Sequence, residues 1–267
     1  MRRQRSKQRA RHDAPIIERI QSIKSDHPFW GYRRVWAYMR YRDGIIIGKN
    51  RVYRLMKEND LMVPKNQMLK AKRTSTRSKP KASRQNQYWG MDMTKVKLNS
   101  WGWVYIHVVL DWCTKEIIGT SVSQSSKTAD WLDALNHAVC QRFQSGIDAI
   151  EQMPELITDN GCQPTSTTFM KSCSILRIKQ IFTTWNNPKG NADTERVFRT
   201  MKEDLVWPNE WDLPFQFSHD FHRWVHDYNT DYPHQSLQYQ TPSQFMSNVN
   251  SKEVSVLKKN QFVVRLS

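Results

Sequence analysis

Cysteine is scarce in this chain, and long apolar runs are absent from it. The four cysteines among 267 residues form no Cys-x-x-Cys pair, so the pattern favours reduced thiols in a cytoplasmic protein over a zinc cage or a disulfide framework. The best apolar run, 104–110, is far shorter than the ~20 residues that cross a bilayer. The Arg-rich N-terminus has no apolar segment behind it and predicts no secretory signal. Membrane and secreted classes of protein are therefore excluded.

Acidic residues are also rare in the first third of the chain, and this shortage sets the charge distribution. The formal net charge is +16; residues 1–85 hold 24 Lys and Arg against 6 Asp and Glu, whereas residues 86–267 hold 17 against 19. Such a concentration indicates an arm that binds a polyanion. Nucleic acid is favoured over an anionic membrane surface, because the arm lacks an amphipathic helix with a broad apolar face.

Residues 1–64 are predicted to form a small all-α domain of three short helices. Asp13 is expected to cap the first helix, and the third, from about Lys49, has an apolar side and a basic side. This pattern predicts a helix-turn-helix whose third helix lies in a major groove. A solvated basic face on a small bundle is an equal alternative for this region alone, and the basic excess moves the balance toward DNA. The predicted DNA contacts are Arg33, Arg34, Lys49, Arg51, Arg54 and Lys57.

Residues 65–85 are predicted to be an extended basic linker. Between Lys65 and Arg84 there are eight basic residues and no acidic ones, with Ser, Thr and Pro among them. A segment of this composition cannot bury a core. It is interpreted either as a passive tether or as a strap along a phosphate backbone, with Lys70, Lys72 and Arg73 as predicted contacts.

Residues 86–247 are predicted to form a mixed α/β domain, and residues 248–267 a C-terminal tail. Three strands with short turns between them indicate an antiparallel meander, after which helices and strands alternate. The expected strands are 88–98, 103–110, 115–122, 155–158 and 178–183, and the expected helices are 127–143, 166–176 and 193 to about 205. This order is that of an RNase H-like fold, with a mixed five-stranded sheet and flanking helices.

Three acidic residues lie where chemistry can use them. Asp92 is in the middle of a strand, where an unpaired buried charge is costly. Asp159 ends a short apolar strand, and Glu195 lies one turn into a helix. Clustered carboxylates are the ligands of Mg²⁺, and phosphoryl transfer onto DNA uses two such cations. Each acid alone also has an ordinary explanation, as a turn residue or as a complement to a helix dipole.

Two further groups of residues are given structural interpretations. His219, His222 and His226 have the spacing of a metal-binding helix face, and we interpret them as a solvated face because no carboxylate pattern accompanies them. Asp111 ends a strand much as Asp159 does, and a turn role is favoured over that of a fourth ligand.

Asp159 and Glu195 have 35 residues between them, which is the spacing of the D,D(35)E transposases and retroviral integrases. The chain resembles most closely the IS-three-type bacterial insertion-sequence transposases, in their second-reading-frame (OrfB-like) subunit. The segments that carry the resemblance are Trp-Gly-Met-Asp-Met-Thr (89–94), Thr-Asp-Asn-Gly (158–161), Asn-Pro-Lys-Gly-Asn-Ala-Asp-Thr-Glu-Arg (187–196), Tyr-Asn (228–229) and Pro-His-Gln-Ser-Leu (233–237), with Gly31–Arg34 and 51–56 in the helical domain. Cys162 and Pro164 depart from the family, which mostly has Ser and Phe there.

The resemblance implies a transposase that cuts DNA at transposon ends and joins the freed 3′-OH to target DNA. Asp92, Asp159 and Glu195 would be its catalytic residues and would hold two Mg²⁺ ions, with Mn²⁺ as a substitute. Arg199 and Lys202, on the helix of Glu195, are predicted to grip the terminal DNA.

The implied partners are the terminal inverted repeats, target DNA, further copies of the chain in a homo-oligomer on DNA, and a first-reading-frame partner or fusion. The implied location is the bacterial cytoplasm, at the nucleoid. The alternatives are a non-catalytic DNA-binding regulator derived from a transposase, and a nuclease of the same fold.

Overall fold

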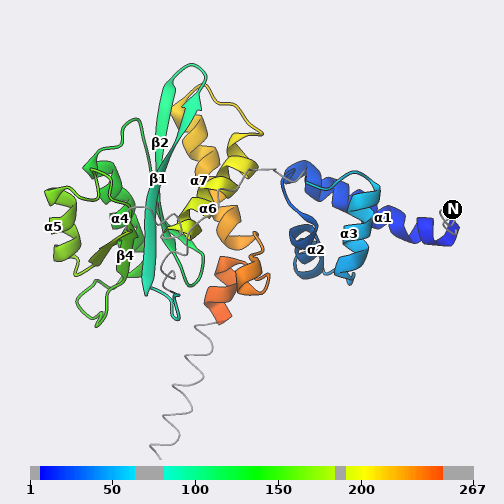
Figure 1. The fold of residues 1–267 in the computed structure, drawn as a ribbon, viewed down its shortest axis with the longest axis horizontal. Helices are drawn as coiled ribbons and strands as arrows, with labels where there is room; N and C mark the ends of the chain where they lie inside the picture. The colour runs from blue at the N-terminus through cyan, green and yellow to red at the C-terminus, as the bar shows by residue number, and fades with distance from the viewer. Residues whose placement is uncertain (1–6, 64–80, 184–190, 249–267) are drawn as a thin grey trace, which may run out of the picture. The chain divides into compact units, whose positions relative to one another are not determined.

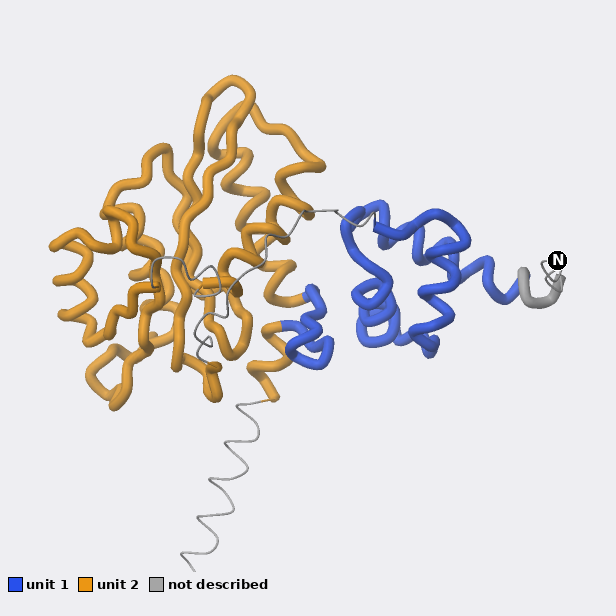
Figure 2. Tube along the Cα trace, viewed as in Figure 1, with its two compact units in different colours: residues 1–72, 231–241 blue, residues 73–230, 242–267 orange. Residues whose placement is uncertain are grey.

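The computed structural model describes residues 7–63, 81–183 and 191–248, which fall into two compact units (Figure 2). The helical unit comprises residues 1–72 and 231–241, and the α/β unit comprises residues 73–230 and 242–267. The predicted linker contacts Lys70, Lys72 and Arg73 lie outside the described residues, and the predicted domain boundaries stay predictions. Within the described stretches, no helix combines the length and apolar character needed to cross a membrane.

The helical unit contains α1 (Lys7–Asp26), α2 (Tyr32–Tyr41) and α3 (Lys49–Glu58), which Figure 1 shows beside one another. α3 begins at Lys49, as the sequence predicts, and its apolar side buries Val52, Leu55 and Met56. The prediction for α1 is wrong in one respect. The helix begins at Lys7, so Asp13 lies inside it and does not cap it. Residues 7–11 are Lys, Gln, Arg, Ala and Arg, all strong helix formers that extend the helix past Asp13.

Asp13 instead joins α1 to α3. Its side chain is buried, with a relative exposure of 2%, and Arg51 Nη2 and Arg54 Nη2 lie 2.7 Å and 2.9 Å from its two oxygens. Burial by itself raises the pKa of Asp13, but the hydrogen bonds and charges of Arg54 and Arg51 outweigh burial and lower this pKa below its ordinary value. The ion pairs thus hold two helices of the unit together.

We expect Asp13→Asn to destabilise the helical unit by about 1–3 kcal/mol at neutral pH, because the charge-assisted hydrogen bonds from Arg51 and Arg54 are weakened. The native pKa of Asp13 is lowered, so its contribution is present above the ordinary value of 3.8 and is lost as the pH falls through the native pKa. Urea unfolding followed by circular dichroism at neutral and acidic pH measures this. The difference between wild type and variant should shrink in acid, and exposed Glu18→Gln is the control. An equal difference at both pH values would contradict this role.

The segment 231–241 belongs to the helical unit although it follows α7 in the sequence. The ring of Tyr232 packs edge-on against that of Trp30, with 5.2 Å between the ring centroids. The ring of Tyr239 packs edge-on against that of Trp36, with 5.3 Å between the centroids. The segment also contains a short 3₁₀ turn, η2 (Gln235–Leu237). These aromatic contacts join residues about two hundred positions apart, so they have no local signal in the sequence.

The α/β unit is built on a five-stranded sheet with the order β3-β2-β1-β4-β5. β1 (Tyr88–Leu98), β2 (Gly102–Asp111) and β3 (Ile117–Ser123) form the expected antiparallel meander. β4 (Glu155–Thr158) and β5 (Lys179–Phe182) extend the sheet in parallel with β1. The structure therefore confirms the predicted mixed sheet of an RNase H-like fold.

Helices cover both faces of this sheet (Figure 1). α4 (Thr128–Arg142) and α5 (Thr167–Ile175) lie on one side, and α6 (Ala192–Met201) and α7 (Pro214–Thr230) lie on the other. The helix expected from 193 to about 205 ends its α-helical geometry at Met201. It continues as one π-helical turn, η1 (Lys202–Val206).

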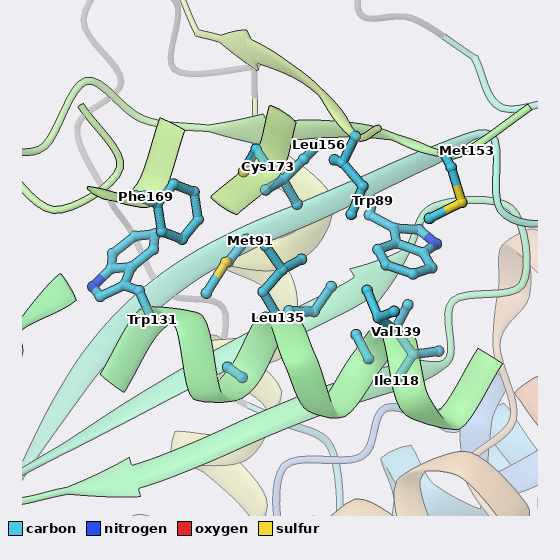
Figure 3. Packing of buried hydrophobic residues seen from close by; sticks show 14 residues of the cluster. Trp89, Met91, Ile118, Trp131, Leu135, Val139, Met153, Leu156, Phe169 and Cys173 are labelled. Atoms are coloured by element: carbon cyan, nitrogen blue, oxygen red, sulfur yellow. The ribbon is translucent and has the colours of Figure 1, made fainter. Parts of the chain in front are cut away.

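The main core lies between the sheet and α4 and α5 (Figure 3). Trp89 and Met91 of β1 pack there against α4 and α5. α4 approaches β3 closely at Gly119, where an added Cβ would lie 2.3 Å from the carbonyl oxygen of Ala134. Because side chains alternate along a strand, Gly90 and Asp92 face the opposite side, toward α6.

Candidate active site

Asp92 and Asp159 come from neighbouring strands of the sheet. The parallel pairing of β1 and β4 includes Gly90 opposite Ile157. Asp92 and Asp159 follow Gly90 and Ile157 by two residues each. Continuing the register past the end of β4 therefore places the two acids side by side. Asp92 is half-buried and accepts a hydrogen bond from its neighbour Met93 N at 2.7 Å. The backbone N–H of Met93 therefore orients the carboxylate of Asp92.

The turn after β4 presents Asp159 to solvent. Asp159 Oδ1 accepts a hydrogen bond from Gly161 N at 3.0 Å. Asn160 Nδ2 donates to Thr183 O at 2.5 Å, which ties the turn to the chain after β5. The Asn-Gly pair thus holds the turn in place and leaves the carboxylate of Asp159 exposed.

The first turn of α6 carries Glu195 and is attached to β1 by Asn191. Asn191 Nδ2 donates to Met91 O at 3.2 Å, at the residue that precedes Asp92. Glu195 N in turn donates to Asn191 O at 3.0 Å. One buried asparagine therefore links the helix of Glu195 to the strand of Asp92.

Gly90 allows this helix to lie against the strand. A Cβ added at Gly90 would lie 2.3 Å from Trp112 Nε1 and 2.4 Å from Thr194 Oγ1. It would also lie 2.9 Å from Asn191 Oδ1. Sequence reasoning assigned no role to Gly90 or Asn191, although both lie within the family-like segments that carry Asp92 and Glu195.

The first turn of α6 contains two acids, and the structure distinguishes them. Asp193 Oδ2 lies 2.7 Å from Lys115 Nζ, in an ion pair between α6 and the turn after β2. Glu195 is exposed and has no ion pair among the described residues. Of the two, Glu195 is therefore the one whose carboxylate is available to a ligand.

The charges of Asp159 and Glu195 act on the carboxyl group of Asp92. The pKa of Asp92 is raised from 3.8 to about 7, chiefly by burial and to a smaller extent by the charges of Asp159 and Glu195, against the hydrogen bond from Met93 N–H, which acts to lower it. Among the described residues, no three His, Cys, Asp or Glu side chains are close enough to hold a metal ion together. The acids are thus gathered in one region but are not arranged as a complete ligand cage.

The two structural interpretations of acidic and histidine residues agree with the structure. Asp111 is buried, and its carboxylate accepts hydrogen bonds from Asn86 N, Cys113 N and Thr114 N at 2.7, 2.7 and 3.1 Å. It closes the turn after β2. His219, His222 and His226 are all exposed on α7, as expected for a solvated face.

Several predicted DNA contacts have intramolecular partners in the structure. Arg199 Nε lies 2.8 Å from Glu203 Oε1, so it pairs with Glu203 and not with Glu195. Lys202 is half-buried at the start of η1. The Arg34 guanidinium carbon lies 4.1 Å from the ring centroid of Tyr232. Lys49 Nζ lies 4.6 Å from the ring centroid of Trp36. Their contacts with DNA stay predictions.

Two residues of the loop after Asp159 depart from the family. Pro164 is buried, and its carbonyl oxygen accepts a hydrogen bond from Gln180 Nε2 of β5 at 2.9 Å. Cys162 is exposed, and its thiol donates to Gln163 Oε1 at 3.2 Å. Pro164 therefore contributes to packing, whereas the Cys162 side chain remains at the surface.

Comparison with known proteins identifies both parts of the chain. Two family models described as "Integrase core domain" match residues 82–188 and 176–242, and one described as "HTH-like domain" matches residues 11–67. The chain is 25% identical over 245 residues to the transposase InsD for insertion element IS2A/D/F/H/I/K of Escherichia coli, covering 89% of this chain and 81% of the relative. The InsD transposase for IS2-9 of Escherichia coli strain K12 matches at the same identity, with 79% of its length covered.

A solved structure has the same fold. A chain in the cryo-EM structure of the simian T-cell lymphotropic virus intasome, in complex with PP2A regulatory subunit B56 gamma, aligns with a TM-score of 0.50. It shares 16% sequence identity and covers 85% of this chain and 73% of its own length. The sheet, the matched domains and the insertion-element relatives agree, and the chain belongs to the insertion-element transposases with an HTH-like domain and an integrase core.

Proposed function

We propose that this transposase cleaves DNA at the ends of its insertion element and joins the 3′-OH to target DNA, using Asp92, Asp159 and Glu195 as ligands of two Mg²⁺ ions. One observation carries the proposal. The charges of Asp159, at the end of β4, and Glu195, on α6, help to raise the pKa of Asp92 on β1, and none of the three carboxylates is paired with a basic side chain in the described part of the chain. Such a group of acids is stabilised by a cation.

The donor set fits Mg²⁺, and also Mn²⁺, because it consists of carboxylate oxygens alone. Bound divalent ions would activate the attacking oxygen and stabilise the leaving oxygen at phosphorus. The protein contributes the orientation of its ligands. Backbone N–H groups hold Asp92 and Asp159, and Asn191 holds the helix of Glu195 against β1.

The DNA partners of this site are the terminal inverted repeats and the target DNA. We propose that phosphates contact the basic first third of the chain, the linker residues Lys70, Lys72 and Arg73 included, and that Arg199 and Lys202 grip the terminal DNA beside Glu195. Further parts of the proposal are a homo-oligomer on DNA, a first-reading-frame partner or fusion, and action at the bacterial nucleoid.

One assay separates this proposal from its alternatives. Labelled end DNA, target DNA and Mg²⁺ are incubated with the protein, with and without the first-reading-frame segment. Joined product is expected. Cleavage without joining would indicate a nuclease, and binding without cleavage under both conditions would indicate a regulator.

We expect Arg199→Ala and Lys202→Ala to lower end-DNA binding and strand transfer together. Arg199 lies on α6 with Glu195, and Lys202 begins the turn η1 that continues it. Each substitution removes one cation, so the magnitude of the slope of log affinity against log salt should fall by about one per lost phosphate contact. Binding is measured by fluorescence anisotropy at several salt concentrations. Lys171→Ala, an exposed lysine on α5, controls for general loss of charge. Helix variants that bind and join no worse than this control would exclude the proposed contacts.

A further inference from the structure

One side of α3 is occupied by bonds within the helical unit. Arg51 donates to Asp13 Oδ1 through Nε at 2.9 Å and Nη2 at 2.7 Å, and also to His12 O. Arg54 donates to Asp13 Oδ2 at 2.9 Å and to Glu58 Oε2 at 3.0 Å. If these arginines turned to DNA, the buried carboxylate of Asp13 would lose its partners, which is costly. These guanidinium groups therefore serve the fold.

Another side of α3 is free of such bonds. Asn50, Tyr53 and Lys57, spaced by three and four residues, form one exposed stripe, which we call the α3 stripe. In the described part of the chain, the side chains of Asn50 and Lys57 make no hydrogen bond or ion pair. Tyr53 keeps 40% of its surface exposed. These three side chains can contact a partner without loss of the ion pairs that hold the helical unit together.

The start of α2 extends this surface. The rings of Tyr53 and Tyr32 meet edge-on at 4.9 Å, and the guanidinium carbon of Arg33 lies 5.4 Å from the Tyr32 ring centroid. Arg33 is exposed. The stripe is thus bordered by a second cation on the neighbouring helix, and it contains no acidic side chain. Its charge complements a polyanion, in a region where basic residues outnumber acidic ones 24 to 6 over residues 1–85.

We infer that α3 reads the major groove of duplex DNA through the α3 stripe, and not through Arg51 and Arg54. This inference rests on the DNA binding proposed above and adds which side chains recognise the bases. An asparagine side chain donates to and accepts from adenine in the major groove, and apolar or aromatic groups pack on the thymine methyl. Lys57 and Arg33 neutralise phosphates. The partner is therefore a duplex whose site contains an A·T pair opposite Asn50.

Selection from a duplex library with a randomised central segment tests this inference on the full-length protein. Wild type is expected to enrich a motif with an A·T pair. Asn50→Ala should lose about tenfold in discrimination at that pair and change overall affinity little. Lys57→Ala should weaken binding to all sequences and reduce the salt slope by about one. Lys171→Ala is the matched control for charge.

Arg54→Ala distinguishes the fold from the reading surface. This variant should melt at a lower temperature, yet enrich the wild-type motif under conditions where circular dichroism shows it folded. The inference is overturned if Asn50→Ala and Tyr53→Ala keep the wild-type motif and discrimination, or if folded Arg54→Ala changes the motif. Salt-dependent binding without any enriched motif would overturn the inference but leave DNA binding standing. Absence of DNA binding would overturn both this inference and the proposed function.

Discussion

Asp92→Asn, Asp159→Asn and Glu195→Gln are each expected to abolish DNA cleavage and joining while leaving DNA binding nearly unchanged. Each variant keeps the shape of the side chain and removes the charge that a divalent cation needs. We expect a loss of about a thousandfold or more in rate, because a misligated cation forfeits several kcal/mol of transition-state stabilisation. Binding should survive, since most affinity for DNA comes from phosphate contacts made by basic residues.

The assay compares cleavage of labelled end DNA in Mg²⁺ with binding of the same DNA measured without metal. Asp133→Asn, which removes an exposed carboxylate from α4, is the control for loss of acidic charge. Asp133→Asn should cleave like wild type. Near-normal cleavage by any one of the three variants would remove that residue from the site and would leave the other two to be tested on their own.

Gly90→Ala is expected to damage the site without touching any carboxylate. The added methyl group has no room between β1 and α6, where Trp112 Nε1 and Thr194 Oγ1 would lie 2.3 and 2.4 Å away. We expect a loss of about 1–3 kcal/mol of stability from overpacking. The methyl group should also push α6 away from β1 and so misplace Glu195. We expect this displacement to lower the cleavage rate by about a hundredfold.

Thermal unfolding and the cleavage assay measure these two effects separately. Gly31→Ala is the matched control, because nothing lies within 4 Å of a Cβ added at that position. Gly31→Ala should unfold and cleave like wild type. If Gly90→Ala matched Gly31→Ala in both assays, close packing of α6 against β1 would not be what positions Glu195.

Several local elements of this protein were determined by its sequence. β1 and β4 lie at the predicted residues, 88–98 and 155–158, because alternation and short apolar runs between turn residues are properties of contiguous sequence. The candidate acids were also identified from local sequence, Asp92 within a strand, Asp159 before an Asn-Gly turn and Glu195 in the first turn of a helix, and their roles as ligands stay predictions. The RNase H-like fold followed from the order of these elements.

Which polar groups pair with one another was decided only by the tertiary structure. Asp13 bonds to Arg51 and Arg54, about forty positions away, and Asp193 pairs with Lys115 across two elements. These pairings engage Arg51 and Arg54 within the helical unit and leave Glu195, not Asp193, available to a ligand. No local pattern predicts them, because a charged side chain takes whichever partner packing brings within a few ångströms once it is buried.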